Sequence, residues 1–493
     1  MSRQIVANSD SPREAAELWG HPRQLWMLLG VTVGFNFAFY GFRAYLAPYI
    51  AQTFYAGLGP ASAQRQADLL TSGLLALMYA TPIVGGYVAD KFLGQVRSLV
   101  LSLWLGIPSL LLMALPSLFG FEMGTALFAL SAGLSIPLTV LIGSNYDKSD
   151  PRREGGYTLF YLAINLGAFL APFVCADFVG HRFGYRWGFI AAAAAMACAA
   201  GMLQLRARKL QAALPRGDAS RGPMATIWVM AAIAALLYPL ALLLSMPQVL
   251  SAVMYVLMGL LVLYFIVSSV RRRDRLQTRR YIALLLLFSA LVLFWALSFQ
   301  GVTSLNFFAR DYVSAPFDYT LFQSANPLFI LIFAPLLAML WPWLGRRGKD
   351  PSTTRKFGIG LLLVALSYGL TAAAIRYATP SGGRVAWGVL AGCYLLQTLG
   401  ELALSPIGYS LVGLLAAPQE TSLAMGGWFF GYALAYQLAG AIATLTTAAP
   451  GGAEAGIAAY AHVYGVLCAV GMGASLVYLL AAPYLKKLMH GVH

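Results

Sequence analysis

The sequence predicts an all-α membrane protein that crosses the bilayer fourteen times. Of its 493 residues, 59% are apolar and 10% are charged, whereas an ordinary soluble domain has about 45–50% and about 25%. The charges gather in short polar runs, and between these runs lie fourteen mostly apolar stretches. Each stretch has about 18 residues or more, enough for a helix to cross a hydrocarbon core about 30 Å thick. These observations exclude a soluble globular protein.

The fourteen expected spans follow one another along the chain as 25–55, 69–89, 98–115, 123–144, 157–178, 187–205, 226–245, 249–270, 281–305, 320–344, 357–377, 387–415, 421–443 and 460–482. A transmembrane β-barrel would instead show segments of about ten residues that alternate between polar and apolar. These runs are long and apolar on every face, so we expect helices.

The basic residues predict the orientation. The first 24 residues contain no apolar core, so we expect no cleavable signal peptide and a cytoplasmic amino terminus. With that start, 26 of the 33 Lys and Arg fall in segments on the inner side and six fall in outer loops. Basic residues resist translocation, so this asymmetry predicts that both termini are cytoplasmic.

The spans are grouped as six, two and six. We expect an N-terminal six-helix bundle over 1–205, a linker with a two-helix insertion over 206–280 and a C-terminal six-helix bundle over 281–493. Glycines, then Asp90 and Arg97, follow the second span, and a weaker echo of this segment follows the tenth. At a cytoplasmic helix end, such a carboxylate and guanidinium can act as a latch. The segment resembles the signature between helices two and three of the major facilitator superfamily, which implies two bundles that rock about a central site.

Four further segments resemble the proton-dependent oligopeptide transporters of that superfamily. They are 40–44 (Tyr-Gly-Phe-Arg-Ala), 155–168 (Gly-Gly-Tyr-Thr-Leu-Phe-Tyr-Leu-Ala-Ile-Asn-Leu-Gly-Ala), 322–330 (Phe-Gln-Ser-Ala-Asn-Pro-Leu-Phe-Ile) and 400–408 (Gly-Glu-Leu-Ala-Leu-Ser-Pro-Ile-Gly). Bacterial members also carry a two-helix insertion. The resemblance implies that Asn165, Asn326 and Glu401 hold the amino end of a peptide.

The sequence departs from the family where protons are usually coupled. Thr32, Phe35 and Asn36 stand where members have Glu-x-x-Glu-Arg on helix one. Residues 136–138 read Ile-Pro-Leu instead of Lys-Pro-Asn, and Phe299 replaces the glutamate of helix seven. We therefore expect weak or absent proton coupling.

Two charged residues are expected at membrane depth, Arg43 and Glu401. Such a charge costs roughly 2.5–3.5 kcal/mol on insertion scales and is a functional hypothesis by default. Arg43 shares a helical stripe with Tyr40 and Asn36, and Glu401 shares a face with Ser405. We expect Arg43 and Glu401 to face each other across the cavity and to engage opposite ends of a solute. The alternatives are a structural ion pair that joins the two halves, and side chains that snorkel to the membrane interface.

Several aromatic residues match or flank positions that line the pocket in the family. They are Tyr40, Tyr79, Trp295, Trp428 and Tyr432. For each of them, contact with the solute and packing in the core both remain open.

These observations predict a secondary transporter of di- and tripeptides, or of peptide-like amine-bearing solutes, that works by alternating access. Glu401 is the candidate for any proton coupling, and its partner Arg43 is the only cation expected to meet a carboxylate. The alternatives are an exporter or facilitator of a non-peptide drug or metabolite, and a solute sensor that does not transport.

The sequence lacks the motifs typical of enzymes, nucleotide-binding proteins and metal sites. The five histidines form no HExxH or HxxxxD pattern, and no Gly-x-x-x-x-Gly-Lys-Ser/Thr loop occurs, so we expect neither an enzyme nor a nucleotide cofactor. The four cysteines lie singly within spans, which predicts no metal site. The net charge of +15 lies at helix ends and suits topology and anionic lipids better than nucleic acid. We expect a monomer in the bacterial inner membrane, with the solute and the lipid bilayer as its partners.

Overall fold

The described part of the protein is almost entirely helical in a computed structural model. The structure describes residues 17–147, 150–213, 222–272, 274–378, 384–417, 419–447 and 452–489. Within these ranges, fourteen helical segments are long and apolar enough to cross a membrane, as predicted.

The helices form an N-terminal group, a hairpin and a C-terminal group. The N-terminal group comprises α1 (Arg23–Arg43), α2 (Leu46–Thr53), α3 (Pro60–Val88), η1 (Ala89–Leu93), α4 (Gln95–Met113), α5 (Leu118–Gly133), α6 (Pro137–Gly143), α7 (Arg152–Ala171), η2 (Pro172–Gly180), α8 (His181–Phe183) and α9 (Tyr185–Ala213). The hairpin consists of α10 (Pro223–Leu244) and α11 (Pro247–Arg272). The C-terminal group comprises α12 (Arg275–Ser298), η3 (Phe299–Val302), α13 (Ser304–Tyr312), η4 (Tyr319–Ser324), α14 (Ala325–Arg346), α15 (Thr353–Ala378), α16 (Trp387–Leu415), α17 (Thr421–Ala443), η6 (Thr444–Thr447) and α18 (Gly452–Leu488).

Four two-residue strands accompany the helices. β1 (Glu17–Leu18) pairs with β2 (His21–Pro22) in antiparallel orientation, and β3 (Val313–Ser314) pairs with β4 (Val385–Ala386) in parallel orientation. The second pair ties the loop after α13 to the start of α16.

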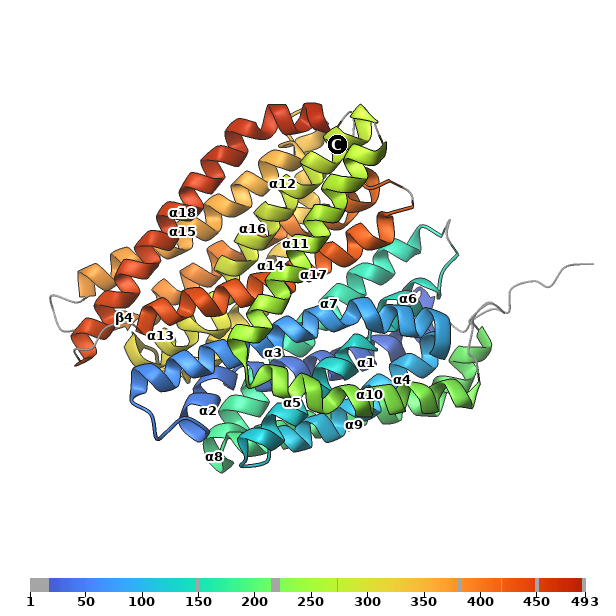
Figure 1. Cartoon of the computed structure of the whole chain (residues 1–493), viewed down its shortest axis with the longest axis horizontal. Coiled ribbons are helices and arrows are strands. Elements are labelled where there is room, and N and C mark those ends of the chain that lie inside the picture. Colours follow the sequence, from blue (N-terminus) through green and yellow to red (C-terminus); the bar gives the residue numbers. More distant parts are fainter. Residues whose placement is uncertain are drawn as a thin grey trace, which may run out of the picture.

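Each group has its own packed helices. In the N-terminal group α1 packs against α7 and α9, and α4 packs against α5 and α9; in the C-terminal group α15 packs against α16 and α18. The groups meet along α3 and α17, and also along α7 and α14. Figure 1 shows the two groups converging at the end that carries α2, α8 and α13, and diverging toward the end where the chain's carboxyl end lies. We call the first of these the closed end.

The first helix of each group is broken, where the sequence predicted one continuous span. α1 ends at Arg43 and α2 starts at Leu46, while α12 gives way to η3 and α13 around Thr303. Backbone groups freed at a break need partners when they are shielded from water. The side-chain amide of Asn306 donates a hydrogen bond of 3.0 Å to the Ala44 carbonyl, so the two breaks stabilise each other across the groups.

Polar contacts fasten the two groups at the closed end. The contacts between side chains are Gln64 with Tyr460 at 2.8 Å, Tyr185 with Tyr319 at 3.3 Å, and His181 with Asp318 at 3.2 Å. In addition, the Ser324 hydroxyl donates to the Phe169 carbonyl at 2.8 Å. Five polar contacts, with that of Asn306, therefore hold this end together.

The two arms of the inserted hairpin pack on different groups. α10 lies mainly against α5, whereas α11 lies mainly against α17 and α12 and also touches α3 near Gly73 (Figure 1). Ser251 of α11 donates to Gln437 of α17 at 2.8 Å. The carboxylate of Glu420, just before α17, accepts hydrogen bonds from Tyr264 and Ser268 of α11. The polar bonds of α11 thus attach it to the C-terminal group.

A glycine contact sets the distance between α3 and α5. A Cβ on Gly85 would lie 2.1 Å from the Gly133 carbonyl oxygen, whereas a Cβ on Gly86 would meet nothing closer than Ile136 at 3.9 Å. Backbone cannot rotate out of the way as a side chain can. We therefore expect Gly85→Ala to destabilise the protein by about 3 kcal/mol, at the upper end of overpacking costs.

Thermal unfolding in detergent measures this effect, and Gly86→Ala is the matched control. The expected result is a clearly lower midpoint for Gly85→Ala and a midpoint near wild type for Gly86→Ala. Equal midpoints for the two variants would contradict the proposed α3–α5 contact.

Candidate solute-binding site

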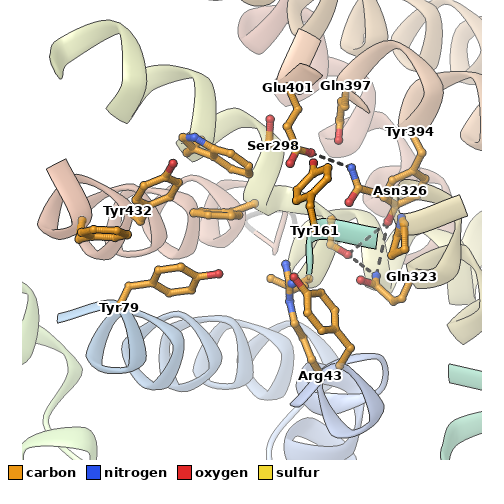
Figure 2. Close-up of a pocket in the computed structure, with 17 residues that line it drawn as sticks. Arg43, Tyr79, Tyr161, Ser298, Gln323, Asn326, Tyr394, Gln397, Glu401 and Tyr432 are labelled. Carbon is orange, nitrogen blue, oxygen red and sulfur yellow. Dashed lines mark hydrogen bonds between the residues drawn. The ribbon is translucent and has the colours of Figure 1, made fainter. Parts of the chain in front are cut away.

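A cavity of about 260 Å³ lies between the two groups, near the breaks in α1 and α12. Small-molecule sites usually enclose about 300–1,000 Å³, so this cavity suits a small solute. Helices of both groups line it, as Figure 2 shows. The lining residues are Tyr40, Arg43, Tyr79, Tyr161, Trp295, Ser298, Phe299, Gly301, Val302, Gln323, Asn326, Pro327, Tyr394, Gln397, Glu401, Phe429 and Tyr432.

Arg43 is the cation of the cavity. It is the last residue of α1, so the break that follows places its side chain beside the cavity. The guanidinium carbon lies 5.0 Å from the centre of the Tyr40 ring and 5.9 Å from that of Phe39. Its Nε has no hydrogen-bond partner among the described residues. A guanidinium with an open N–H in a cavity can bind an oxygen of a solute.

Glu401 is the carboxylate of the cavity and lies on the opposite side from Arg43 (Figure 2). Its Oε2 accepts a hydrogen bond of 2.8 Å from the Asn326 side-chain amide, which also contacts the Thr398 hydroxyl at 3.0 Å. No ion pair joins Glu401 to Arg43 in the part of the chain that is described. The structure therefore favours two separate charged ends over a structural ion pair.

Aromatic rings form one wall between these charges. The rings of Tyr79 and Tyr432 stack with centroids 5.7 Å apart, and Trp295 lies 5.2 Å from Tyr432. Phe299, at the position of the family's helix-seven glutamate, stacks on Tyr436 at 3.6 Å. An aromatic pair thus fills the place of an ionisable group.

Seven of the eleven residues predicted to bind solute line this cavity. They are Tyr40, Arg43, Tyr79, Trp295, Asn326, Glu401 and Tyr432.

Asn36, Asn165 and Trp428 lie outside the lining. The Asn36 and Asn165 amides donate to backbone carbonyls of their own helices, at Thr32 and Tyr161. Trp428 is 1% exposed and packs edge-on against Phe288. The Ser405 side chain is outside the described part of the structure.

The predicted latch residues, Asp90 and Arg97, are not among the residues that line the cavity. Asp90 in η1 is exposed and accepts a hydrogen bond of 2.7 Å from Gln95. Arg97 is exposed on α4 and lines a separate groove with Arg208 of α9. Their role as a latch stays a prediction.

Five polar lining residues were missed from the sequence: Tyr161, Ser298, Gln323, Tyr394 and Gln397. Spacing could have found most of them, since each lies three, four or seven residues from a predicted site residue on the same helical face. Gln397 and Tyr394, for example, precede Glu401 by four and seven residues on α16.

The expectation that only Arg43 and Glu401 are charged residues at membrane depth stays a prediction, but the structure buries two further carboxylates in helices that are long and apolar enough to cross a membrane. Asp68 is fully buried and Glu122 is 5% exposed, and both lie within membrane-spanning segments. Asp68 was missed because the expected span began one residue later, whereas α3 begins at Pro60.

The described residues contain no group of three or more His, Cys, Asp or Glu side chains that could hold a metal ion.

Two groups of six helices, an inserted pair and a central cavity with contributions from both groups define a transporter of the major facilitator superfamily. A profile of the POT family matches residues 121–463. The chain belongs to the POT family of peptide transporters.

Bacterial relatives match along most of the chain. The protein is 31% identical over 490 residues to the uncharacterized transporter YclF of Bacillus subtilis, covering 96% of each chain. It is 32% identical over 462 residues to the peptide transporter YePEPT of Yersinia enterocolitica, covering 86% of this chain and 88% of that one.

Solved structures of similar proteins contain small ligands. A peptide transporter POT mutant in complex with alafosfalin superposes with a TM-score of 0.83 at 29% identity, covering 97% of this chain and 98% of that one. A POT family transporter in complex with 5-aminolevulinic acid gives a TM-score of 0.80 at 27% identity, covering 96% and 99%.

Proposed function

We propose that the protein transports a small solute with an amino group, either a peptide or a peptide-like molecule, by alternating access. The observation that carries the proposal is the separation of Arg43 from Glu401 across the cavity, with no ion pair between them. Glu401, oriented by Asn326, binds the amino group, and Arg43 binds an oxygen at the other end. The aromatic wall contacts the apolar part between them.

One cation limits what the second end of the solute can be. The positions of the family's other carboxylate-binding groups hold Asn36 and Ile136, and Asn36 is engaged with the Thr32 carbonyl. A single guanidinium can bind a carboxylate with two hydrogen bonds. We therefore propose a solute whose other end is less anionic than that of a plain dipeptide, as in a modified peptide or an amine.

Similar proteins offer a precedent for such ligands. 5-Aminolevulinic acid, bound by one similar transporter, is not a peptide but has an amino group at one end. This supports an amine-bearing solute without fixing its identity.

A thermal-shift screen of the purified protein tests the solute class. Dipeptides, dipeptide amides, 5-aminolevulinic acid and polyamines are compared, since a ligand of the folded state raises apparent stability. We expect amine-bearing compounds with a neutral or weakly anionic second end to give the largest shifts. Tight binding of unmodified di- and tripeptides, with no response to amides or amines, would overturn the proposed solute class.

A counterflow assay in proteoliposomes separates transport from sensing. Accumulation of labelled solute against unlabelled solute inside is expected of a transporter and is impossible for a sensor that only binds. An exporter of a non-peptide metabolite would show counterflow with that metabolite and none with amines.

We propose weak or absent proton coupling, because the family's usual proton-coupling groups are replaced by neutral side chains. Lumenal pH during solute uptake is the measurement. Solute-dependent acidification that Glu401→Gln abolishes would contradict the proposal.

We also propose that both termini are cytoplasmic in a bacterial inner membrane, so that the closed end faces outward. The N- and C-terminal groups then move as bodies over 1–205 and 281–493, and the 206–280 insertion connects them. Because α10 packs on one group and α11 on the other, the distance between spin labels at Ile227 and Val267 should change with the conformation. A constant distance would show that the hairpin moves with one group alone.

A further inference from the structure

Asp68 is a buried carboxylate that the proposed solute site does not use. Its exposed fraction is 0%, and no close hydrogen bond reaches either carboxylate oxygen in the described part of the chain; the polar side chain that interacts with it is the neutral amide of Gln64, one turn earlier. It lies on α3 eleven residues before Tyr79 of the cavity, about 16 Å toward the closed end. An ionised carboxylate without a cationic partner is strongly disfavoured at a buried position.

Asp68 lies on the seam between the two groups. On α3, Asp68 and Ser72 face Gly440 of α17: a Cβ on Gly440 would lie 2.5 Å from the Ser72 hydroxyl and 3.4 Å from the Asp68 carbonyl oxygen. The backbone of Asp68 therefore lies against the other group, and Tyr460 of that group interacts electrostatically with its carboxylate. Separation of the groups at this end would therefore expose the carboxylate.

A second cavity lies just beyond Asp68. It encloses about 740 Å³ at the closed end, between α2 and α3 on one side and α13 and α18 on the other. Gln64, one turn before Asp68, and Tyr460 both line it, and they close it off through their hydrogen bond of 2.8 Å. Gln64 therefore borders both this cavity and the turn that carries Asp68.

Among the described residues, no Lys, Arg or His interacts electrostatically with Asp68. Tyr460 of α18 interacts with it electrostatically, and a tyrosine cannot neutralise a carboxylate. Arg310 of α13 is engaged by Asp311 in two contacts of 2.7 and 2.9 Å. The other titratable groups on the helices packed against this part of α3 are Tyr49 on α2, Glu122 on α5 and Tyr436 on α17.

We propose that Asp68 is a proton-binding switch of the closed end. It is protonated while the two groups meet at α3 and α17, and it releases its proton to the same side when they separate. Acid on that side therefore favours the closed end, and alkali favours its opening. Because the proton leaves by the side from which it came, the switch changes the conformation without moving protons across the membrane.

The spacing between the groups at the closed end reports this switch. Spin labels replace Phe183 of α8 and Tyr377 of α15, which are 64% and 89% exposed, in a protein whose Cys198 and Cys468 are serine. Distance distributions are recorded between about pH 8 and about pH 5. For one titrating group, the ratio of closed to open states changes by up to about tenfold per pH unit.

Asp68→Asn mimics the protonated side chain, and Glu122→Gln is the matched control. Glu122 is a second buried carboxylate with an unpartnered oxygen, but it lies on α5 within the N-terminal group. We expect Asp68→Asn to remain closed at every pH, and Glu122→Gln to keep the wild-type pH dependence. A wild-type response in Asp68→Asn, or an equal loss in both variants, would overturn the proposal.

The lumenal pH of proteoliposomes during solute uptake distinguishes this inference from the proposed function. The inference rests on the proposed function for the outward orientation of the closed end. No acidification is expected in wild type or in Asp68→Asn. Acidification that Asp68→Asn abolishes would refute both weak coupling and a proton that returns to its own side. If the wild-type protein binds none of the proposed solutes, only the proposed function is overturned, because Asp68 lies outside the central cavity.

Discussion

Replacing Arg43 by alanine is expected to weaken solute binding by about 10- to 100-fold. A hydrogen bond to a charged group contributes about 1.5–3 kcal/mol, and each 1.4 kcal/mol is a factor of ten. Arg43→Lys keeps the charge but loses the two-pronged guanidinium, so it should restore only part of the affinity. Isothermal titration with the best ligand of the solute screen measures both effects.

The stability of the same variants distinguishes binding from structure. Arg43 makes no ion pair in the described part of the chain, so its removal leaves no buried charge without a partner. We expect the unfolding midpoint of Arg43→Ala to equal or exceed that of wild type in the absence of ligand. A large fall in the midpoint, with binding unchanged, would show that Arg43 is structural.

Glu401→Gln is expected to weaken binding of an amine-bearing solute by about 3- to 10-fold. The substitution removes the negative charge but keeps an oxygen that can accept a hydrogen bond, and a charged hydrogen bond is worth about twice a neutral one. Gln397→Ala is the control, because Gln397 lines the same cavity one turn away on α16 and carries no charge. Near-equal losses in Glu401→Gln and Gln397→Ala would argue against a role for the charge.

Solutes that lack one end test the assignment of the two charges. An amine without a carboxylate should bind Arg43→Ala as well as it binds wild type, yet bind Glu401→Gln weakly. A carboxylate without an amine should show the reverse. If both variants lose both kinds of solute equally, the two side chains do not hold opposite ends.

The breaks in α1 and α12 could not be predicted from hydropathy. Hydropathy gave one span over 25–55, because residues on both sides of the break at Ala44 are apolar. At the break, the carbonyl of Ala44 accepts a hydrogen bond from Asn306, which belongs to the first helix of the other group. A partner 262 residues away leaves no local signal.

The sequence predicted the two charged residues of the cavity but not the neutral polar residues that line it. Arg43 and Glu401 stand out in apolar spans, since a charge there is costly. Asn36 and Asn165 match the family's motifs equally well, yet their amides bond to their own backbone instead of lining the cavity. Whether such a side chain lines the cavity depends on its rotamer and on the rotation of its helix, and the residue type determines neither.

The sequence alone determined that this is a membrane protein with fourteen helices, because bilayer thickness sets span length and the cost of burying charge sets where polar runs fall. Its motifs indicated the POT family, and the match of the POT family profile to residues 121–463 confirms it. Only the tertiary structure decided which end of the molecule is closed, which arm of the hairpin follows which group, and that Asp68 lies sealed on the seam. These features depend on contacts between segments hundreds of residues apart, whose geometry is set by close packing and not by local pattern.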